Sequence, residues 1–220
     1  MTDKNIDITI AILNYNRQNF LDRSVRSCSD QILFNKRFEI IVVDDNSTDS
    51  SLKKIKSLKL TNLKIIRNKK NMGAGYSSNI ALKNAKGKYF IRVDSDDFLN
   101  KHALNDMSKV LDFNKDVSMV YCDHFKVDEN GLKEKLVKLD TINKIKNHGA
   151  GIMFRSKILR KVGGYDTKLR QCEDYDLISK LIKKGYKKHY IPIPYYRYYI
   201  HGSNITLTDD RKKYYRNINK

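Results

Sequence analysis

Short apolar runs along the chain alternate with stretches in which apolar residues recur every three or four positions. The runs predict strands at 8–13, 38–43, 63–67 and 89–93. The helical spacing predicts helices around 20–28, 50–58 and 74–85 between them. This alternation of strands and helices indicates a mostly parallel α/β sheet that is covered by helices.

The second half of the chain has a less regular pattern. A helix is expected at 102–113, strands at 118–122 and 125–127, a turn at Gly163-Gly164, and an amphipathic helix at 174–184. We find no internal repeat and no linker, and 220 residues suit one domain. We therefore expect a single α/β domain followed by a basic tail at 209–220.

Carboxylates gather where predicted strands end or predicted helices begin. The groups are Asp44-Asp45, then Asp94, Asp96 and Asp97, and finally Glu173-Asp174 with Asp176. In an open α/β sheet the ligand crevice lies at the carboxyl ends of the strands. Asp is also a common turn residue, which is the alternative explanation, above all for the first group. Three like charges within four residues are unfavourable unless a cation or solvent offsets them, and an Asp-x-Asp pair suits Mg²⁺ or Mn²⁺.

The third group has two interpretations. Acidic residues at a helix N-terminus are stabilised by the free amides and the helix dipole, so Glu173 and Asp174 fit a capping role. A carboxylate that is held there beside a crevice also fits a general base.

Composition excludes several classes of protein. Hydrophobic residues make up 40% of the chain, enough for a sizeable core, and the longest apolar runs are strand-sized rather than membrane-spanning. Three scattered cysteines and the absence of a signal-like segment predict a cytoplasmic protein with reduced thiols.

The formal charge of +19 raises the question of a partner. Rings and cations interleave at 186–190 and 211–216, as they do in single-strand binders, so a basic nucleic-acid-binding module is an alternative function. The acids nevertheless concentrate at the predicted crevice, and we expect no nucleic acid. An anionic membrane surface, contacted peripherally on its inner face, and a merely solvated Lys-rich surface both fit the charge.

Five motifs occur in the order that is typical of one family. They are Asn14-Tyr15-Asn16-Arg17, Val42 to Asp49, Asn71-Met72-Gly73 to Gly87-Lys88-Tyr89, Asp94-Ser95-Asp96-Asp97, and Gly163-Gly164-Tyr165-Asp166 followed by Glu173-Asp174. Together they resemble the family 2 glycosyltransferases. The resemblance implies a single Rossmann-like GT-A domain over 1–208, with a mostly parallel central sheet flanked by helices. About 1–100 would bind the nucleotide sugar, and about 101–208 would form a smaller, mixed acceptor-side region.

The resemblance also implies roles for individual residues. Those expected to bind the donor are Asn14, Tyr15, Asn16, Arg17, Asp45, Asn71, Gly73, Asn79, Asp94 and Ser95. Those expected to hold a divalent cation, Mn²⁺ or Mg²⁺, are Asp96, Asp94 and His201. Those expected on the acceptor side are Gly151, Glu173 and Asp174, with Asp174 as the catalytic base. The chain departs from the family at Ser77-Ser78-Asn79, where Ala-Arg-Asn is usual.

The activity implied by the resemblance is transfer of a sugar from a nucleotide diphosphate, UDP by preference, to a hydroxyl. The acceptor would be a glycan or a lipid-linked glycan, as in bacterial-type surface polysaccharide synthesis, and the anomeric centre would be inverted. The segment after Tyr196 is expected to close over the donor. A glycosidase would also use paired carboxylates, but it would not explain the metal-like motif. A homologue that binds sugar nucleotides without catalysis is a further alternative.

Overall fold

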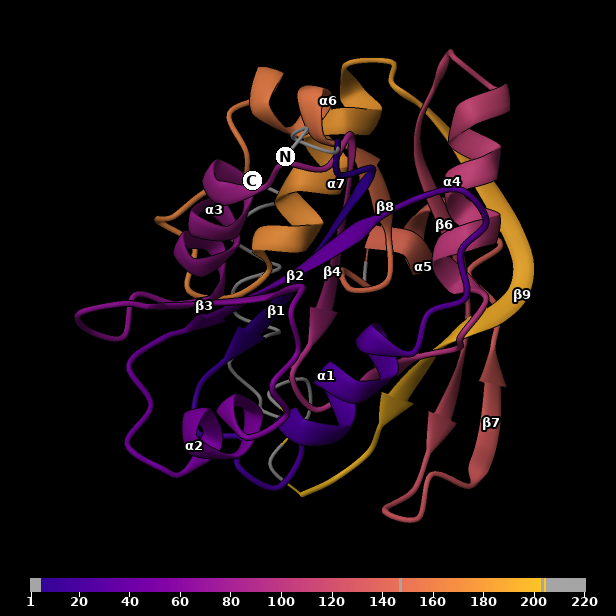
Figure 1. Ribbon diagram of the computed structural model, residues 1–220. Helices are drawn as coiled ribbons and strands as arrows, with labels where there is room; N and C mark the ends of the chain where they lie inside the picture. Colours follow the sequence, from indigo (N-terminus) through magenta and orange to yellow (C-terminus); the bar gives the residue numbers. More distant parts are fainter. Residues whose placement is uncertain (1–4, 147, 203, 205–220) are drawn as a thin grey trace.

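The computed structural model describes residues 5–146, 148–202 and 204 as one α/β domain (Figure 1). The strands are β1 (Ile8–Asn14), β2 (Phe38–Asp44), β3 (Leu63–Arg67), β4 (Tyr89–Asp94), β5 (Phe98–Leu99), β6 (Val117–Val127), β7 (Lys133–Val137), β8 (Met153–Arg155) and β9 (Lys187–Tyr199). The helices are α1 (Leu21–Ser29), α2 (Ser51–Lys56), α3 (Ala74–Asn84), α4 (Ala103–Phe113), α5 (Ile142–Lys146), α6 (Ser156–Lys161) and α7 (Glu173–Lys183). The tail at 209–220, and with it the expected boundary at 208, lies outside the described residues.

The strands form one sheet in the order β3-β2-β1-β4-β8-β6-β9-β5, and β7 pairs with the free side of β6. Strands β1 to β4 run parallel, and the helices α1, α2 and α3 connect consecutive strands along the chain. The remaining part is mixed: β8 is antiparallel to both β4 and β6, whereas β9 is parallel to β6. The expected α/β class is confirmed, with parallel pairing dominant only in the first half.

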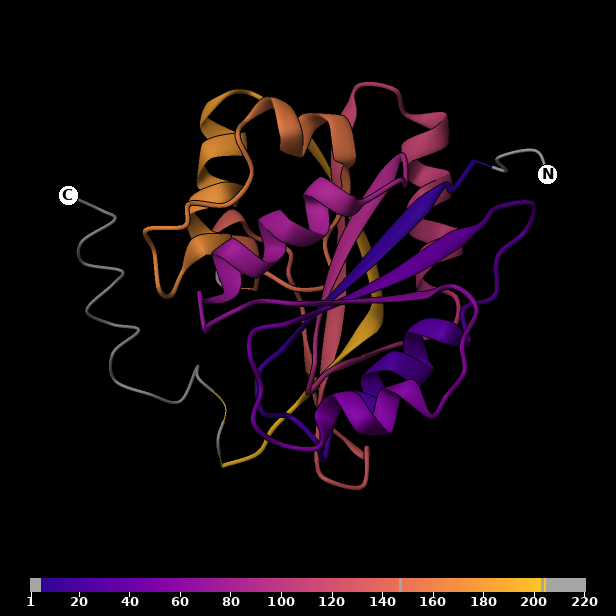
Figure 2. The same ribbon diagram turned by 60° about the vertical axis from the view of Figure 1, so that its left-hand side comes forward.

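Helices cover both faces of the sheet (Figure 2), and an apolar layer lies on each face. Alternate residues of the strands, such as Ile10 and Ala11, point to opposite faces, and both faces are buried. One layer is completed by α1, α2 and α4, and the other by α3, α5, α6 and α7. Burial on both faces explains why the strands consist of almost continuous β-branched and aromatic runs.

Sheet register brings the polar strand ends together. Asn14 pairs with Asp44 across β1 and β2, Leu13 pairs with Asp94 across β1 and β4, and Arg67 pairs with Asp44 across β3 and β2. The carboxyl ends of the parallel strands therefore meet at one edge, as the sequence predicted.

One prediction about the second half was wrong. Strand β6 is continuous, because β9 pairs with it from Val117 to Val127 and the polar Asp123-His124 step is absorbed as a register shift. Asp123 accepts hydrogen bonds from the Tyr190 hydroxyl and the Leu139 N–H, which makes its burial tolerable. The interleaved rings and cations at 186–190 lie at the start of β9 and at the residue before it.

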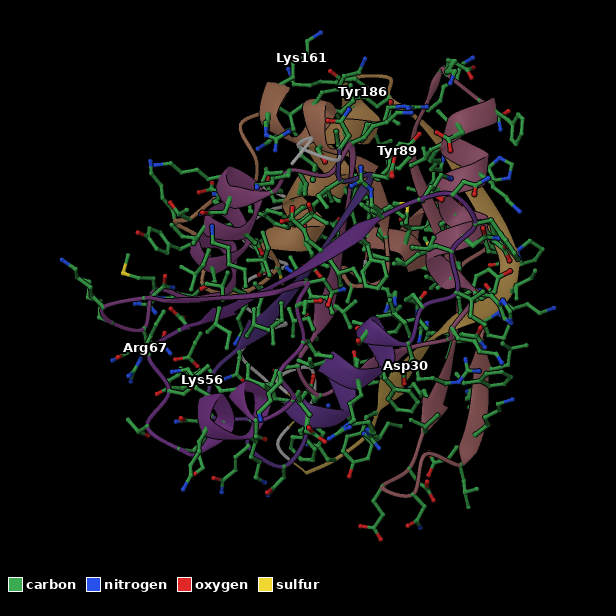
Figure 3. All side chains as sticks on the ribbon, in the orientation of Figure 1. Asp30, Lys56, Arg67, Tyr89, Lys161 and Tyr186 are labelled. Atoms are coloured by element: carbon green, nitrogen blue, oxygen red, sulfur yellow. The ribbon has the colours of Figure 1, made fainter. Side chains whose placement is uncertain are left out.

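No lysine among the described residues is buried, so these cations lie on the surface. Lys56 of α2 and Lys161 of α6 are exposed, at the lower left and the top of Figure 3. Among the described residues, no helix combines the length and the apolar character that a membrane span requires.

Candidate active site

A cavity of about 600 Å³ opens at the carboxyl ends of the parallel strands. Most of the residues that the sequence predicted for the site line this cavity. They are Asn14, Tyr15, Asn16, Arg17, Asp45, Asn71, Gly73, Asp94, Ser95, Asp96, Glu173 and Asp174. They come from the ends of β1, β2 and β4, from the loop before α3, and from the first turn of α7. Segments that are far apart in the sequence are thus assembled by the sheet.

The two acids after β2 have different surroundings. Asp44 is fully buried and accepts hydrogen bonds from Asn14 Nδ2 at 2.8 Å and from the Ser47 hydroxyl, so it stabilises the turn. Asp45 faces the cavity. Its Oδ1 accepts from the Met72 N–H at 2.9 Å and its Oδ2 accepts from the Gly73 N–H at 2.7 Å. These bonds fix the Asp45 carboxylate and leave acceptor capacity for a hydroxyl or N–H of a ligand.

The three acids at the end of β4 also differ in whether they face the cavity. Asp94 and Asp96 line the cavity, and the Asp94 side chain is 39% exposed. Asp97 is 1% exposed and turns away, accepting hydrogen bonds from the Tyr196 hydroxyl at 2.6 Å and from the Tyr199 N–H at 2.9 Å. Burial, together with the charges of Asp96 and Asp94, raises the pKa of Asp97 well above its usual value. Asp97 therefore anchors β9 to the acidic turn.

His201 reaches the acidic turn from the segment that follows β9. Its Nε2 lies 3.0 Å from Asp96 Oδ2, and Arg17 Nε lies 3.5 Å from the same oxygen. The His201 ring stacks on Phe20 with the centroids 4.7 Å apart. No group of three or more His, Cys, Asp or Glu side chains in the described part of the chain is arranged to hold a metal ion by itself. Asp96 and His201 nevertheless offer oxygen and nitrogen at one point, and Mg²⁺ and Mn²⁺ commonly take only one or two protein ligands beside substrate phosphate.

The first turn of α7 presents the third acidic group. Cys172, the residue before the helix, has a left-handed backbone with φ of 62° and lines the cavity. Asp174 Oδ1 accepts a hydrogen bond from the Tyr175 N–H at 2.8 Å. The other side of Asp174 packs against Gly149, where any Cβ would overlap the carboxyl group. This close approach requires glycine at position 149.

Arg92 of β4 lies between the last two acidic groups. Its Nη1 donates to Glu173 Oε1 at 2.8 Å, its Nε lies 3.4 Å from Asp94 Oδ1, and its Nη2 lies 3.9 Å from Asp174 Oδ2. Burial disfavours the charge of this guanidinium, but the surrounding carboxylates raise its pKa well above the ordinary value. Burial and the repulsion from Asp174 raise the pKa of Glu173, and the ion pair with Arg92 opposes that rise.

Three predicted residues do not line the cavity. Asn79 on α3 bonds to the backbone of Tyr165, donating from Nδ2 to the carbonyl at 2.8 Å and accepting at Oδ1 from the N–H at 2.9 Å. Gly151 has φ of +71°, and a Cβ there would lie 2.5 Å from the Tyr196 ring. These contacts give Asn79 and Gly151 packing roles beside the site. The third residue, His201, contacts the lining residue Asp96.

Sequence reasoning also missed part of the lining: Arg92, Arg170, Gln171, Cys172, Tyr198 and Asn204. One signal was available. A charged residue interrupts the apolar run of β4 at Arg92, and a buried Arg is rarely found without acidic partners. The other residues belong to loops or to β9, whose position the local pattern did not indicate.

Comparison with solved structures identifies the fold. TarS of S. aureus in complex with UDP has a TM-score of 0.74 and 24% identity, over 89% of this chain and 61% of that chain. The mannosyltransferase PcManGT from Pyrobaculum calidifontis in complex with GDP-Man and Mn²⁺ has a TM-score of 0.72 and 19% identity, over 92% of this chain and 59% of that chain. The fold is the GT-A fold of glycosyltransferases, as the motifs predicted.

The family follows from the sequence comparisons. The family model described as glycosyl transferase family 2 matches residues 9–167, and the chain belongs to this family. An uncharacterized glycosyltransferase of Methanocaldococcus jannaschii is 31% identical over 82% of this chain and 66% of its own length. Chondroitin synthase of Pasteurella multocida is 31% identical over 94% of this chain and 22% of its own length. The chain thus spans from two thirds to about a fifth of the length of these relatives.

Proposed function

We propose that this chain transfers a sugar from a nucleotide-diphosphate sugar, with a UDP-sugar favoured, to a hydroxyl of a glycan or lipid-linked acceptor, with inversion. The observation that carries the proposal is the convergence of Asp45, Asp94, Asp96 and Asp174 on one cavity from three separate segments, the ends of β2 and β4 and the first turn of α7. Relatives named chondroitin synthase support polysaccharide synthesis as the setting. TarS structures with UDP and with UDP-GlcNAc support the choice of nucleotide.

The donor would lie along the strand ends, with its nucleoside at Asp45 and its diphosphate toward Asp96. Asp45 is already held by two backbone N–H groups, so it is preorganised to accept a hydrogen bond from a base or ribose. Arg17 lies at the diphosphate end and offers a positive charge to the leaving group. Asp96 and His201, with Asp94 nearby, are the residues that would hold a divalent cation. When bound, such a cation would neutralise charge on the departing diphosphate.

Asp174 would act as the general base for the acceptor hydroxyl. It lies in the first turn of α7 and lines the same cavity as Asp45. Direct displacement of the diphosphate by the acceptor oxygen inverts the anomeric carbon and needs one base but no enzyme nucleophile. Binding the acceptor against Asp174 would also displace water that could otherwise hydrolyse the donor.

A thermal-shift and product-release assay tests the proposal. UDP, UDP-GlcNAc and GDP-Man would each be added with Mn²⁺, Mg²⁺ or EDTA, and released nucleotide would be measured with and without a glycan acceptor pool. A ligand at about 100 times its Kd should raise the melting temperature by roughly 5–10 °C. Failure of every nucleotide to bind the unmodified chain would refute the donor assignment.

Two substitutions separate binding from chemistry. Asp96→Asn is expected to abolish the metal-dependent part of donor binding. Asp174→Asn is expected to retain donor binding and to lose transfer by about 10²-fold or more. Asp116→Asn is the matched control, because Asp116 is an exposed acid that pairs with Lys187 away from the cavity. Near-normal turnover of Asp174→Asn would contradict the base assignment, whereas nucleotide binding without any turnover would favour the non-catalytic homologue.

A further inference from the structure

Arg92 is the buried cation of the candidate site, and the role proposed for the site does not yet account for it. The side chain is 6% exposed and extends from β4, two residues before Asp94. Its guanidinium faces carboxylates from two elements: Asp94 at the end of its own strand, and Glu173 and Asp174 in the first turn of α7. Arg92 is therefore the charged connection between the strand that carries the acidic turn and the helix that carries the base.

The three contacts differ in kind. The bond to Glu173 is a charge-assisted hydrogen bond of 2.8 Å between two buried groups. The contact of Nε with Asp94 at 3.4 Å is electrostatic, since this nitrogen has no hydrogen-bond partner among the described residues. Asp174 Oδ2 at 3.9 Å is outside hydrogen-bond distance. The hydrogen bond of Arg92 is therefore to Glu173, whereas its contacts with Asp94 and Asp174 are longer.

We propose that Arg92 is a positioning residue, which fixes the Asp174 carboxylate in the cavity by tying the first turn of α7, through Glu173, to strand β4. This inference rests on the proposed role of Asp174 as the base. Glu173 directly precedes Asp174, so fixing the Glu173 side chain fixes the start of the helix and the direction in which the next side chain points. On the far side, Gly149 closes against Asp174 and completes its confinement.

Electrostatics require a cation at this position. Without Arg92, three carboxylates would face one another in and around a largely buried pocket, and the pocket would also repel an anionic donor. The fork of a guanidinium can contact several carboxylates at once, which a lysine ammonium does less well. Lysine would nevertheless keep the positive charge. Substitution by lysine therefore separates the role of the charge from the role of the several guanidinium contacts.

Arg155 provides a matched control. It is a similarly buried arginine, 7% exposed, on the neighbouring strand β8. Its guanidinium donates to the backbone carbonyls of Val117, Leu111 and Asn114, and no acidic partner for it is present in the described structure. Arg155→Gln therefore removes a buried guanidinium and destabilises the fold without changing the carboxylates of the site.

The experiment compares Arg92→Gln, Arg92→Lys, Glu173→Gln, the Arg92→Gln/Glu173→Gln pair and Arg155→Gln. For each variant, the melting temperature, the Kd for UDP with Mn²⁺, and kcat and KM for the donor are measured. We expect Arg92→Gln to lower kcat by about 10²-fold, as for a base misplaced by about 1 Å, and to change the UDP Kd by less than about fivefold. Arg92→Lys should recover about tenfold of that loss, and Arg155→Gln should lower the melting temperature without lowering kcat.

Buried-charge coupling gives a second readout. Arg92→Gln leaves Glu173 buried without a counterion, so the paired substitution should melt at a higher temperature than Arg92→Gln alone. Equal losses of kcat in Arg92→Gln and Arg155→Gln, or a loss of UDP affinity as large as the loss of kcat, would overturn the positioning role. If Arg92→Gln does not fold, Arg92→Lys and Glu173→Gln test the proposal instead. A positioning role then predicts that each lowers kcat more than it changes the Kd for UDP.

Failure of the proposed function would be visible separately, since the unmodified chain would then bind no nucleotide. Even if the chain binds no nucleotide, hydrogen exchange tests whether Arg92 holds the first turn of α7 against strand β4. The Asp176 N–H, which donates to the Cys172 carbonyl in the first turn of α7, should exchange at least about tenfold faster in Arg92→Gln than in Arg155→Gln, while the amides of β1 and β2 do not differ. Equal exchange in α7 would show that Arg92 does not hold the helix.

Discussion

Gly149→Ala is the substitution that tests most directly how the base is confined. A Cβ at this position would overlap the carboxyl oxygen, Cβ and Cγ of Asp174. Carbon and oxygen atoms pack at about 3.5 Å, so Asp174 or its loop would have to move by more than about 1 Å. A displacement of 1 Å at a reacting group costs on the order of 10²-fold in rate. Gly149 does not have a positive φ, so the methyl group would act through this clash and not through backbone strain.

The assay measures transfer and nucleotide binding in parallel. We expect kcat to fall by about 10²-fold in Gly149→Ala, because Asp174 leaves its productive position. The Kd for UDP should stay within about threefold, since Asp45 and Asp96 lie elsewhere on the cavity wall. Gly185→Ala is the control: its φ is +75° and its Cβ would meet no atom within 4 Å, so it should cost about 1 kcal/mol of stability and leave kcat unchanged.

A double substitution identifies the route of the effect. If Gly149→Ala acts through Asp174, then adding it to Asp174→Asn should lower the residual rate by less than about threefold. A full further loss of 10²-fold, or a Gly149→Ala enzyme with normal kcat, would refute the assignment of this contact.

Two further predictions concern stability against pH. Burial, with a nearby cation, lowers the pKa of His124 from 6.5 to about 4, so the folded state holds this ring neutral. The contribution of the neutral His124 ring to the free energy of unfolding is fully present above about pH 6.5. It should fall by about 3 kcal/mol as the pH drops to 4, because His124 in the unfolded chain takes up a proton at a higher pH than in the folded chain. Urea unfolding at several pH values should show this slope in the unmodified chain, and an equal slope in His124→Phe would disprove the cause. Asp112 is partly buried, yet hydrogen bonds from Lys36, Tyr89 and Lys88 lower its pKa below the usual 3.8. Asp112→Asn should therefore cost about 1–2 kcal/mol at pH 7, and its deficit relative to the unmodified chain should shrink as the pH falls below 3.8; a deficit that is constant with pH would mean that the charge is not responsible.

The first half of the fold could be predicted because its pattern is local. Strands β1, β2 and β4 are largely buried, so each is dominated by apolar residues, and each ends at a polar turn that is visible in the sequence. The second half could not be predicted equally well. Strand β9 contains two prolines and has no regular alternation of apolar and polar residues, and it becomes a strand because β6 offers an edge along its whole length.

The sequence by itself determined the class of fold, the family and the three places where acids gather at strand ends. The tertiary structure decided which of those acids can meet a ligand. Asp44 and Asp97 are chemically the same as Asp45 and Asp96, but Ser47 and Asn14 hold the first inward, and Tyr196 and Tyr199 hold the second. The direction of a side chain on a turn depends on partners from distant segments, which a local pattern does not contain. For the same reason, only the folded chain brings Arg92 and Gly149 to Asp174.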